Sequence, residues 1–282
     1  MIDTDKAYCV GLPDGRKISY SDIGTGENGT WIHCHGIPGS RKEAHHLQHQ
    51  LLSKGVRLIV PDRPGYGQST PANHYGFSEH SDDLRQLADH LELDDFMLSG
   101  FSGGGVFAMA TAHDLGKRIE QLVIAATPAV PLMNNPFDYA SELTASTWRA
   151  ALDDRDALAK ELEIITGSVD VLLEALIGGV GDQEEHYLSS NSVRPGFTQN
   201  LCAALEQGTK TAADALARDS LLTAQPWPFS PQDIHLPVRV IHGSGDRLVH
   251  IEHQSTLSSN FPDSSSELIS GAHYGALSAI WN

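Results

Sequence analysis

The sequence is poor in cysteine and in basic residues, and it has no long hydrophobic run. Its cysteines are Cys9, Cys34 and Cys202. They lie far apart without a C-x-x-C pair, which argues against a disulfide framework and against a zinc site. Lysine and arginine number 19 against 36 aspartate and glutamate, a net charge of −17. Because phosphate backbones require a basic face, we expect no nucleic-acid partner.

No targeting or membrane segment stands out either. The N-terminal stretch MIDTDKAYCVGL lacks the basic start and apolar core of a signal peptide. No apolar run approaches the length of roughly 20 residues that a membrane-spanning helix needs, so we expect a cytoplasmic protein without a membrane span. The 282 residues, 40% hydrophobic and 20% charged, fit one large globular domain or one domain with an insertion. The sequence does not indicate an oligomeric state.

Short β-rich runs alternate with helical runs in the first half of the chain and again near its end. Strands are expected at 17–23, 31–34, 56–60, 96–99, 122–126, 238–241 and 267–269. Helices are expected near 41–53, 78–91, 103–115 and 250–260, and from about 274. The strands are nearly continuous in apolar residues, which is typical of a parallel sheet covered by helices on both faces. The sequence therefore predicts an α/β fold with a mostly parallel central sheet.

Residues 133–230 differ from the rest because they carry helical patterns and no convincing strand. Apolar residues recur at helical spacing in the stretches 138–152, 156–165 and 168–177. A further helix is expected at 209–222. We therefore predict an α/β core formed by residues 1–132 and 231–282, with residues 133–230 inserted as a helical cap. Such an insertion can cover the carboxyl edge of the sheet, where open α/β folds bind their ligands.

The most informative motif is the pentapeptide Gly100-Phe101-Ser102-Gly103-Gly104. It is a G-x-S-x-G sequence between a predicted strand and a predicted helix, which is the context of a nucleophile elbow. The serine sits on a turn so sharp that side chains two residues before and after it would collide, so glycine is required at both positions. The following helix points its free N–H groups at the site, where they favour negative charge. Ser102 is therefore the predicted nucleophile.

A serine nucleophile needs a base, and the base needs a carboxylate to orient it. The strand 238–241 runs into a glycine turn that presents Asp246, and the strand 267–269 does the same for His273. The chain order Ser, Asp, His matches that of α/β-type hydrolases. The alternative is that Asp246 is only a turn residue and His273 only a loop residue.

Fourteen other histidines compete for the role of base, because the chain has 15 in all. Three of them, His45, His46 and His49, lie on the helix expected near 41–53. A metal-binding pair is conceivable there, but a solvated helix face is favoured. We expect no metal ion and no organic cofactor.

An acyl-transfer site also needs two N–H groups that stabilise the developing oxyanion. The Gly103 N–H, directly after the nucleophile, is one candidate. The loop that follows the strand 31–34 contains closely spaced glycines, which let its backbone approach a ligand, and the Ile37 N–H is the second candidate. An alternative role for this loop is the start of a helix capped by Ser40, and the two roles are compatible.

Two segments match the glycine pattern of dinucleotide-binding loops. Residues 24–29, GTGENG, match it letter for letter, but a strand follows them where the motif requires a helix. A hairpin turn is predicted there instead. The second match, Gly103-x-Gly105-x-x-Ala108, opens a helix but lacks the acidic residue at the end of the next strand. We therefore expect no nucleotide cofactor.

Five segments together make the chain resemble the α/β-hydrolase superfamily, particularly small serine hydrolases with a helical cap. They are HGIPGS at 35–40, DRPGYGQS at 62–69, GFSGGG at 100–105, HGSGD at 242–246 and GAH at 271–273. The resemblance implies a Ser102–His273–Asp246 triad and an oxyanion hole at Ile37 and Gly103. In the family, the loop that corresponds to 62–69 usually shapes the sheet edge and takes no part in the chemistry.

The predicted function is that of a serine hydrolase acting on a small-molecule carboxylic ester or related acyl bond, a carboxylesterase-like activity of class EC 3.1.1. Serine at the nucleophile position disfavours epoxide hydrolases and haloalkane dehalogenases, which have aspartate there, and HGIPG departs from the HGGPG of proline iminopeptidases. The same triad could instead cleave an amide, as in an aminopeptidase, or a lactone or carbon–carbon bond. A hypothesis from another class is a ligand sensor or signalling protein built on a hydrolase scaffold.

Overall fold

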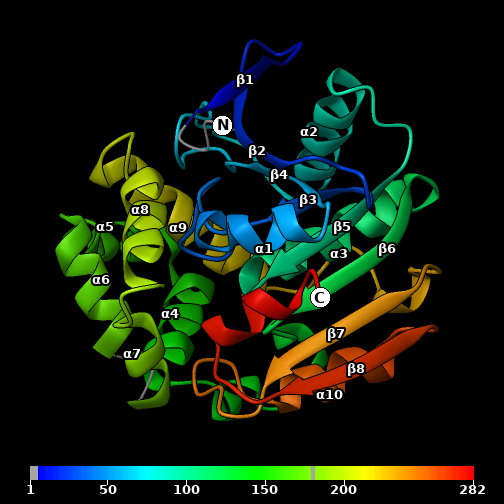
Figure 1. Ribbon diagram of the computed structural model, residues 1–282. Helices are drawn as coiled ribbons and strands as arrows, with labels where there is room; N and C mark the ends of the chain where they lie inside the picture. The colour runs from blue at the N-terminus through cyan, green and yellow to red at the C-terminus, as the bar shows by residue number, and fades with distance from the viewer. Residues whose placement is uncertain (1–5, 179–181) are drawn as a thin grey trace.

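An eight-stranded sheet forms the centre of the computed structural model, which describes residues 6–178 and 182–282 (Figure 1). Residues 1–5 and 179–181, which belong to the predicted core and the predicted cap, lie outside the described residues. The strands are β1 (Tyr8–Gly11), β2 (Lys17–Gly24), β3 (Thr30–Cys34), β4 (Arg57–Pro61), β5 (Phe96–Phe101), β6 (Ile119–Ala125), β7 (Val238–Gly243) and β8 (Ser264–Ile269). They lie side by side in the order β1-β2-β4-β3-β5-β6-β7-β8.

The six strands from β3 to β8 run parallel, whereas β1 pairs with β2 and β2 with β4 in antiparallel fashion. The predicted α/β fold with a mostly parallel sheet is thereby confirmed. Since parallel strands end at one edge, the loops after β3, β4, β5, β7 and β8 meet at the carboxyl edge of the sheet.

Two strand predictions needed correction. The hairpin expected at 24–29 is wrong, because this turn connects β2 to β3 and β4 lies between those two strands. Strand β8 starts three residues before the predicted 267–269, at Ser264. This outer strand leaves several of its side chains exposed to solvent, so its first half consists of serines and carries no apolar signal.

Helices cover both faces of the sheet. One face carries α2 (Phe77–His90), α3 (Gly103–Leu115) and α10 (Glu252–Asn260), and the other carries α1 (Gln48–Ser53) and the C-terminal 3₁₀ helix η6 (Tyr274–Ala279). Leu87, Phe107 and Leu257 pack beneath the first group, and Leu51 and Ile280 beneath the second. These apolar faces hold the sheet rigid, and with it the loops at its carboxyl edge.

The helix predicted near 41–53 is shorter than expected. Residues 41–44 form turns, a 3₁₀ turn covers His45–Leu47, and the α-helix begins only at Gln48. The first residues of this segment are engaged elsewhere, because the backbone N–H of Arg41 donates to Asp62 Oδ1 (2.6 Å) and the Glu43 carboxylate accepts from the Gly36 N–H (2.9 Å). These contacts with groups outside the segment compete with helix formation.

Between β6 and β7 the described residues form helices without any strand of the sheet. The α-helices are α4 (Glu142–Asp153), α5 (Arg155–Ile165), α6 (Val169–Gly178), α7 (Asp182–Leu188), α8 (Arg194–Ala204) and α9 (Thr209–Ala224). Most of them gather on one side of the sheet (left in Figure 1). Four of the helices were predicted, and α7 and α8 were not. The division into a core and a cap stays a prediction.

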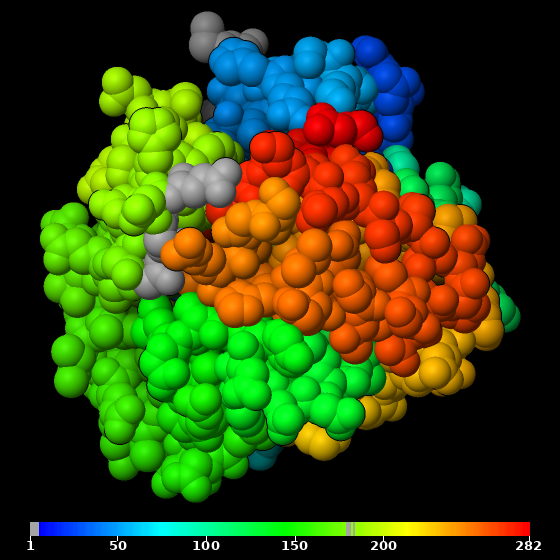
Figure 2. All heavy atoms as spheres, turned by 90° about the horizontal axis from the view of Figure 1, so that it is seen from below, coloured from blue at the N-terminus to red at the C-terminus, as the bar shows by residue number. Residues whose placement is uncertain are grey.

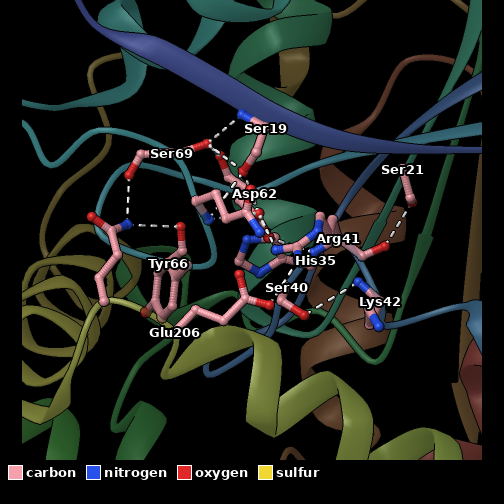
Figure 3. Close-up of polar contacts among 12 residues, drawn as sticks. Ser19, Ser21, His35, Ser40, Arg41, Lys42, Asp62, Tyr66, Ser69 and Glu206 are labelled. Carbon is pink, nitrogen blue, oxygen red and sulfur yellow. Dashed lines mark hydrogen bonds and ion pairs between the residues drawn. The ribbon is translucent and has the colours of Figure 1, made fainter. Parts of the chain in front are cut away.

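The inserted helices are tied to the loops at the carboxyl edge. Arg41 Nη1 contacts Asp62 Oδ2 (2.9 Å) and its Nη2 contacts Glu206 Oε1 (2.8 Å), in the turn between α8 and α9 (Figure 3). On another side, the backbone N–H of His250 donates to the Tyr139 carbonyl (2.9 Å). In Figure 2 the green residues of the insertion accordingly lie against the orange C-terminal segment. No helix within the described ranges combines the length and apolarity needed to span a bilayer.

Candidate active site

Ser102 lies at the turn between β5 and α3, with a backbone φ of 51°. Non-glycine residues rarely adopt positive φ, and such strain persists where the surrounding structure enforces it. A Cβ atom at Gly100 would lie 2.6 Å from the Gly104 carbonyl oxygen, and one at Gly104 would overlap the carbonyls of β3 and the loop after it. Glycine is therefore required at both positions, and the chain there can turn sharply enough to present the Ser102 hydroxyl.

Three polar side chains from separate loops form a chain of hydrogen bonds at the carboxyl edge. His273 Nε2 lies 3.0 Å from Ser102 Oγ, and His273 Nδ1 lies 2.7 Å from Asp246 Oδ2. Because an ionised carboxylate only accepts, Nδ1 carries the proton and Nε2 is left to accept the hydroxyl proton of Ser102. The structure thus brings together the three residues singled out from the sequence, from the loops after β5, β7 and β8.

The Asp246 carboxylate is buried and held in place by backbone donors. Its Oδ1 accepts hydrogen bonds from the N–H groups of Leu248 (2.9 Å) and Val249 (3.0 Å). Its Oδ2 also lies 3.2 Å from Nε2 of the buried His242. Burial alone would raise the pKa of Asp246, but His273 and His242 outweigh it and hold the pKa of this carboxyl well below its usual value. Asp246 is therefore a fixed negative charge beneath the imidazole.

The His273 ring is buried and its basicity is increased. Burial alone would lower the pKa of His273, but the Asp246 carboxylate overcomes this effect, with further contributions from Glu184 and Glu43. The pKa of His273 consequently lies above its usual value. The Phe101 ring, at a centroid distance of 5.0 Å, packs against the imidazole. The ring is thus a strengthened base with a fixed orientation.

The two predicted oxyanion donors lie next to each other beside Ser102. A Cβ atom at Gly103 would come within 2.8 Å of Ile37 Cγ1, so the loop after β3 approaches the first residue of α3 directly. In the described part of the chain, neither the Ile37 N–H nor the Gly103 N–H donates to a protein acceptor. Two free donors at the N-terminus of a helix suit a developing negative charge.

A cavity of about 150 Å³ opens beside Ser102 between the sheet edge and the inserted helices. Its core-side wall includes Ile37, Gly103 and His273, and α4, α5, α6 and α9 supply most of the remaining lining. This lining is mainly apolar, with hydroxyls at Thr144, Thr147, Ser220 and Thr223. Among the residues that the structure describes, no aspartate, glutamate, lysine or arginine lines it. The cavity therefore suits an uncharged group about the size of a benzene ring.

The histidines on the segment after β3 do not form a solvated helix face as expected. His45 is buried, His46 is half-buried and only His49 is exposed. Within residues 6–178 and 182–282, no cluster of three or more His, Cys, Asp or Glu side chains is arranged to hold a metal ion.

Two buried charged residues around the loop after β3 were not predicted from the sequence to belong to the site. Glu43 accepts from the Gly36 N–H and lies 2.9 Å from His33 Nε2, and Arg63 donates to the Gly36 carbonyl at 2.8 Å. Arg63 lies in the segment 62–69, which the family resemblance predicts to shape the sheet edge without taking part in the chemistry. Glu43 has no local signal, because its partners are His33 in β3 and Gly36 in the loop after it, outside its own turn.

Comparisons with known proteins agree with this architecture. A family model described as "alpha/beta hydrolase fold" matches residues 32–166. The putative non-heme chloroperoxidase of Synechocystis sp. is 28% identical over 265 residues, 90% of this chain and 87% of the relative.

A pimeloyl-(acyl-carrier protein) methyl ester esterase of Aromatoleum aromaticum is 28% identical over 220 residues, 75% of this chain and 78% of the relative. The solved structure of a thermophilic esterase from Thermogutta terrifontis aligns with a TM-score of 0.72 at 21% identity, covering 97% of this chain and 93% of that one. The sheet order, the turn at Ser102 and these matches together show that the chain has the α/β-hydrolase fold.

Proposed function

We propose that the chain is a serine hydrolase that cleaves a carboxylic ester of a small, uncharged molecule through an acyl-enzyme intermediate. The observation that carries this proposal is the hydrogen-bond chain from Ser102 through His273 to Asp246 at the wall of an apolar cavity. A nucleophile, a base and an orienting carboxylate in this order are the parts that acyl transfer requires.

In the first half of the reaction, Ser102 Oγ attacks the ester carbonyl carbon while its proton passes to His273 Nε2. The carbonyl oxygen becomes an oxyanion and accepts hydrogen bonds from the Ile37 and Gly103 N–H groups. Asp246 stabilises the positive imidazole that forms. The C–O bond to the leaving group then breaks, and His273 returns its proton to the departing alcohol.

In the second half, a water molecule attacks the acyl-enzyme and gives a proton to His273. The same two N–H groups hold the second oxyanion. The bond to Ser102 Oγ then breaks, the carboxylic acid leaves, and His273 returns the proton to the serine. The cycle uses only protein groups and water, in keeping with the expectation that no metal or organic cofactor takes part.

The cavity supports a substrate without charge. The described part of its lining contains no aspartate, glutamate, lysine or arginine, and its volume of about 150 Å³ accommodates a short acyl chain or a single ring. The relative from Aromatoleum aromaticum is named for a methyl ester, which supports an ester as substrate. We further propose that residues 133–230 act as a cap, because helices of this segment supply much of the lining. The cytoplasmic location stays a prediction.

Turnover of p-nitrophenyl esters of increasing acyl length tests the proposal. We expect kcat/KM to be highest for short acyl chains, and Ser102→Ala to lose nearly all turnover, by about 10⁴-fold or more, while remaining folded. A fluorophosphonate should label Ser102 of the native protein, as mapped by mass spectrometry. Ser146→Ala, at an exposed serine of α4, is the matched control and should retain full activity.

The same experiment separates the other hypotheses. Full activity of Ser102→Ala would refute the proposed nucleophile. Cleavage of amides or lactones in preference to all esters would keep the triad but change the substrate class. A single slow acylation without repeated turnover would instead favour a ligand sensor.

A further inference from the structure

Arg63, in the loop after β4, is buried, and each of its three side-chain nitrogens donates a hydrogen bond to a different residue. Nη1 donates to the His35 carbonyl, Nη2 donates to the Gly36 carbonyl (2.8 Å), and Nε donates to Asp219 Oδ2 (2.7 Å). The backbone N–H of Arg63 also donates to His35 Nε2 (3.1 Å). One residue therefore holds the loop after β3 through both its main chain and its side chain.

The bond from Arg63 to Gly36 bears directly on the candidate oxyanion donor. The Gly36 carbonyl and the Ile37 N–H belong to the same planar peptide group. This peptide bond is trans, and the cis bond of the loop is the following one, Ile37-Pro38. In a trans peptide the C=O and N–H bonds point in opposite directions. Holding the carbonyl oxygen against Arg63 therefore turns the Ile37 N–H away from Arg63, and Ile37 itself lines the cavity.

A second hydrogen bond restrains the same peptide group. Because His35 Nε2 accepts from the Arg63 N–H, its proton resides on Nδ1, which donates to the Gly36 carbonyl (2.9 Å). The Gly36 oxygen thus receives two donors, and one of them is a cation. Withdrawal of electron density toward the guanidinium also makes the N–H at the other end of the peptide a stronger donor.

Arg63 is held in turn by an inserted helix. Asp219 of α9 is fully buried, and its Oδ1 accepts from Arg218 Nε (2.8 Å) while Oδ2 accepts from Arg63 Nε. Arg218 Nη1 then donates to the Pro64 carbonyl, next to Arg63 (2.9 Å). The same helix lines the cavity with Leu216, Ser220 and Thr223. Asp219 therefore links the inserted helices to the loop that carries the oxyanion donor.

We propose that Arg63 is a positioning residue that fixes the direction of the Ile37 N–H, and that Asp219 of α9 holds Arg63 in place for this task. The inference rests on the proposed function, because it assigns an oxyanion to that N–H. It also gives the inserted helices an effect on the chemical step that is separate from enclosing the cavity.

The first test compares Arg63→Lys and Asp219→Asn with wild type in ester turnover. Lysine keeps the charge but lacks the planar fork that reaches two carbonyls and a carboxylate together. We expect Arg63→Lys to lower kcat by about 10- to 100-fold with little change in KM, since an oxyanion contact forms only in the transition state. Asp219→Asn should lower kcat by a smaller factor. The matched control is Asp214→Asn, an exposed residue of α9 paired with Arg155 (2.6 Å), which should leave kcat unchanged.

A transition-state mimic separates positioning from general damage. A trifluoromethyl ketone adds to Ser102 and places an oxyanion between the Ile37 and Gly103 donors, so its Ki should rise by the same factor by which kcat/KM falls in each variant. Thermal melts establish that each variant is folded. If Arg63→Lys is unfolded, Asp219→Asn provides the same comparison.

Two results would overturn the inference: folded Arg63→Lys and Asp219→Asn with wild-type kcat, or a fall in kcat with an unchanged Ki for the ketone. The proposed function fails separately, through an active Ser102→Ala. An inactive Ser102→Ala together with a fully active Arg63→Lys would leave the hydrolase intact and remove only the role of Arg63.

Discussion

Glu184 Oε1 accepts a hydrogen bond from the Tyr274 backbone N–H at 2.6 Å, so a carboxyl group from α7 reaches the loop that carries His273. The side chain is buried, and its Oε2 has no hydrogen-bond partner among the described residues. Burial raises the pKa of Glu184 to about 7. This carboxyl was not identified from the sequence, and we expect it to make both stability and activity sensitive to pH near neutrality.

Glu184→Gln should change how stability depends on pH. The folded-state pKa of Glu184 lies above the ordinary value of 4.5, so its stabilising contribution is complete below that value and is lost as pH rises through about 7. Glutamine resembles the protonated acid and does not ionise, so the variant does not lose this stability as the pH rises. We expect similar free energies of unfolding for variant and wild type at about pH 5, and a more stable variant at about pH 8, by roughly 1–3 kcal/mol.

Urea unfolding at both pH values measures this difference. Glu185→Gln, at the exposed neighbouring position on α7, should follow the wild-type curve. Parallel pH dependence of wild type and Glu184→Gln would contradict the assigned ionisation.

The acid side of the activity profile should move in the same variant. His273 must be neutral to accept the Ser102 proton, so kcat/KM rises with pH through the pKa of His273. The negative charge of Glu184 contributes to raising that pKa. Glu184 carries this charge only above about pH 7, so its replacement lowers the pKa of His273 in that range, and the upper part of the acid limb of the kcat/KM profile shifts to lower pH. An unshifted limb in Glu184→Gln, measured by ester hydrolysis across pH, would show that the carboxyl does not act on His273.

Asp246→Asn should abolish most turnover without unfolding the protein. The amide oxygen can still accept from the N–H groups of Leu248 and Val249, but the amide NH₂ then faces His273 and favours the wrong imidazole tautomer. We expect kcat to fall by about 10⁴-fold. Steady-state kinetics on a short-chain ester measure the loss, and Asp263→Asn at an exposed position is the control. A loss of less than about tenfold would argue against the orienting role.

Gly104→Ala should destabilise the protein because its Cβ atom would overlap the backbone carbonyls of Cys34 and His35. Since neither carbonyl is the end of a flexible side chain, the turn must shift, at a cost of about 1–3 kcal/mol. Gly116→Ala, after the C-terminus of the same helix, is a contrast because its Cβ would meet only Leu236 at an ordinary 3.8 Å. Thermal melts should show a lowered Tm for the first variant only, and equal melting temperatures would contradict this account of the turn.

Several features of the fold could be predicted because their signals are local. The buried strands β5 and β7 are runs of apolar residues, and α4 and α5 have apolar residues at helical spacing. The hairpin at 24–29 was predicted wrongly because strand pairing depends on β4, which inserts between β2 and β3. The short helix before β4 was overestimated because Arg41 and Glu43 form hydrogen bonds with groups outside the predicted helix.

By itself, the sequence determined the alternation of strands and helices and the order of Ser102, Asp246 and His273, because periodicity and turn glycines act over a few neighbouring residues. Only the tertiary structure decided which charged groups surround them. Arg63 meets Asp219 across 156 positions of the chain, and Glu184 meets Tyr274 across 90. A buried charge needs a partner, and the fold can supply this partner from a distant part of the chain. The local sequence does not indicate which distant side chain it is.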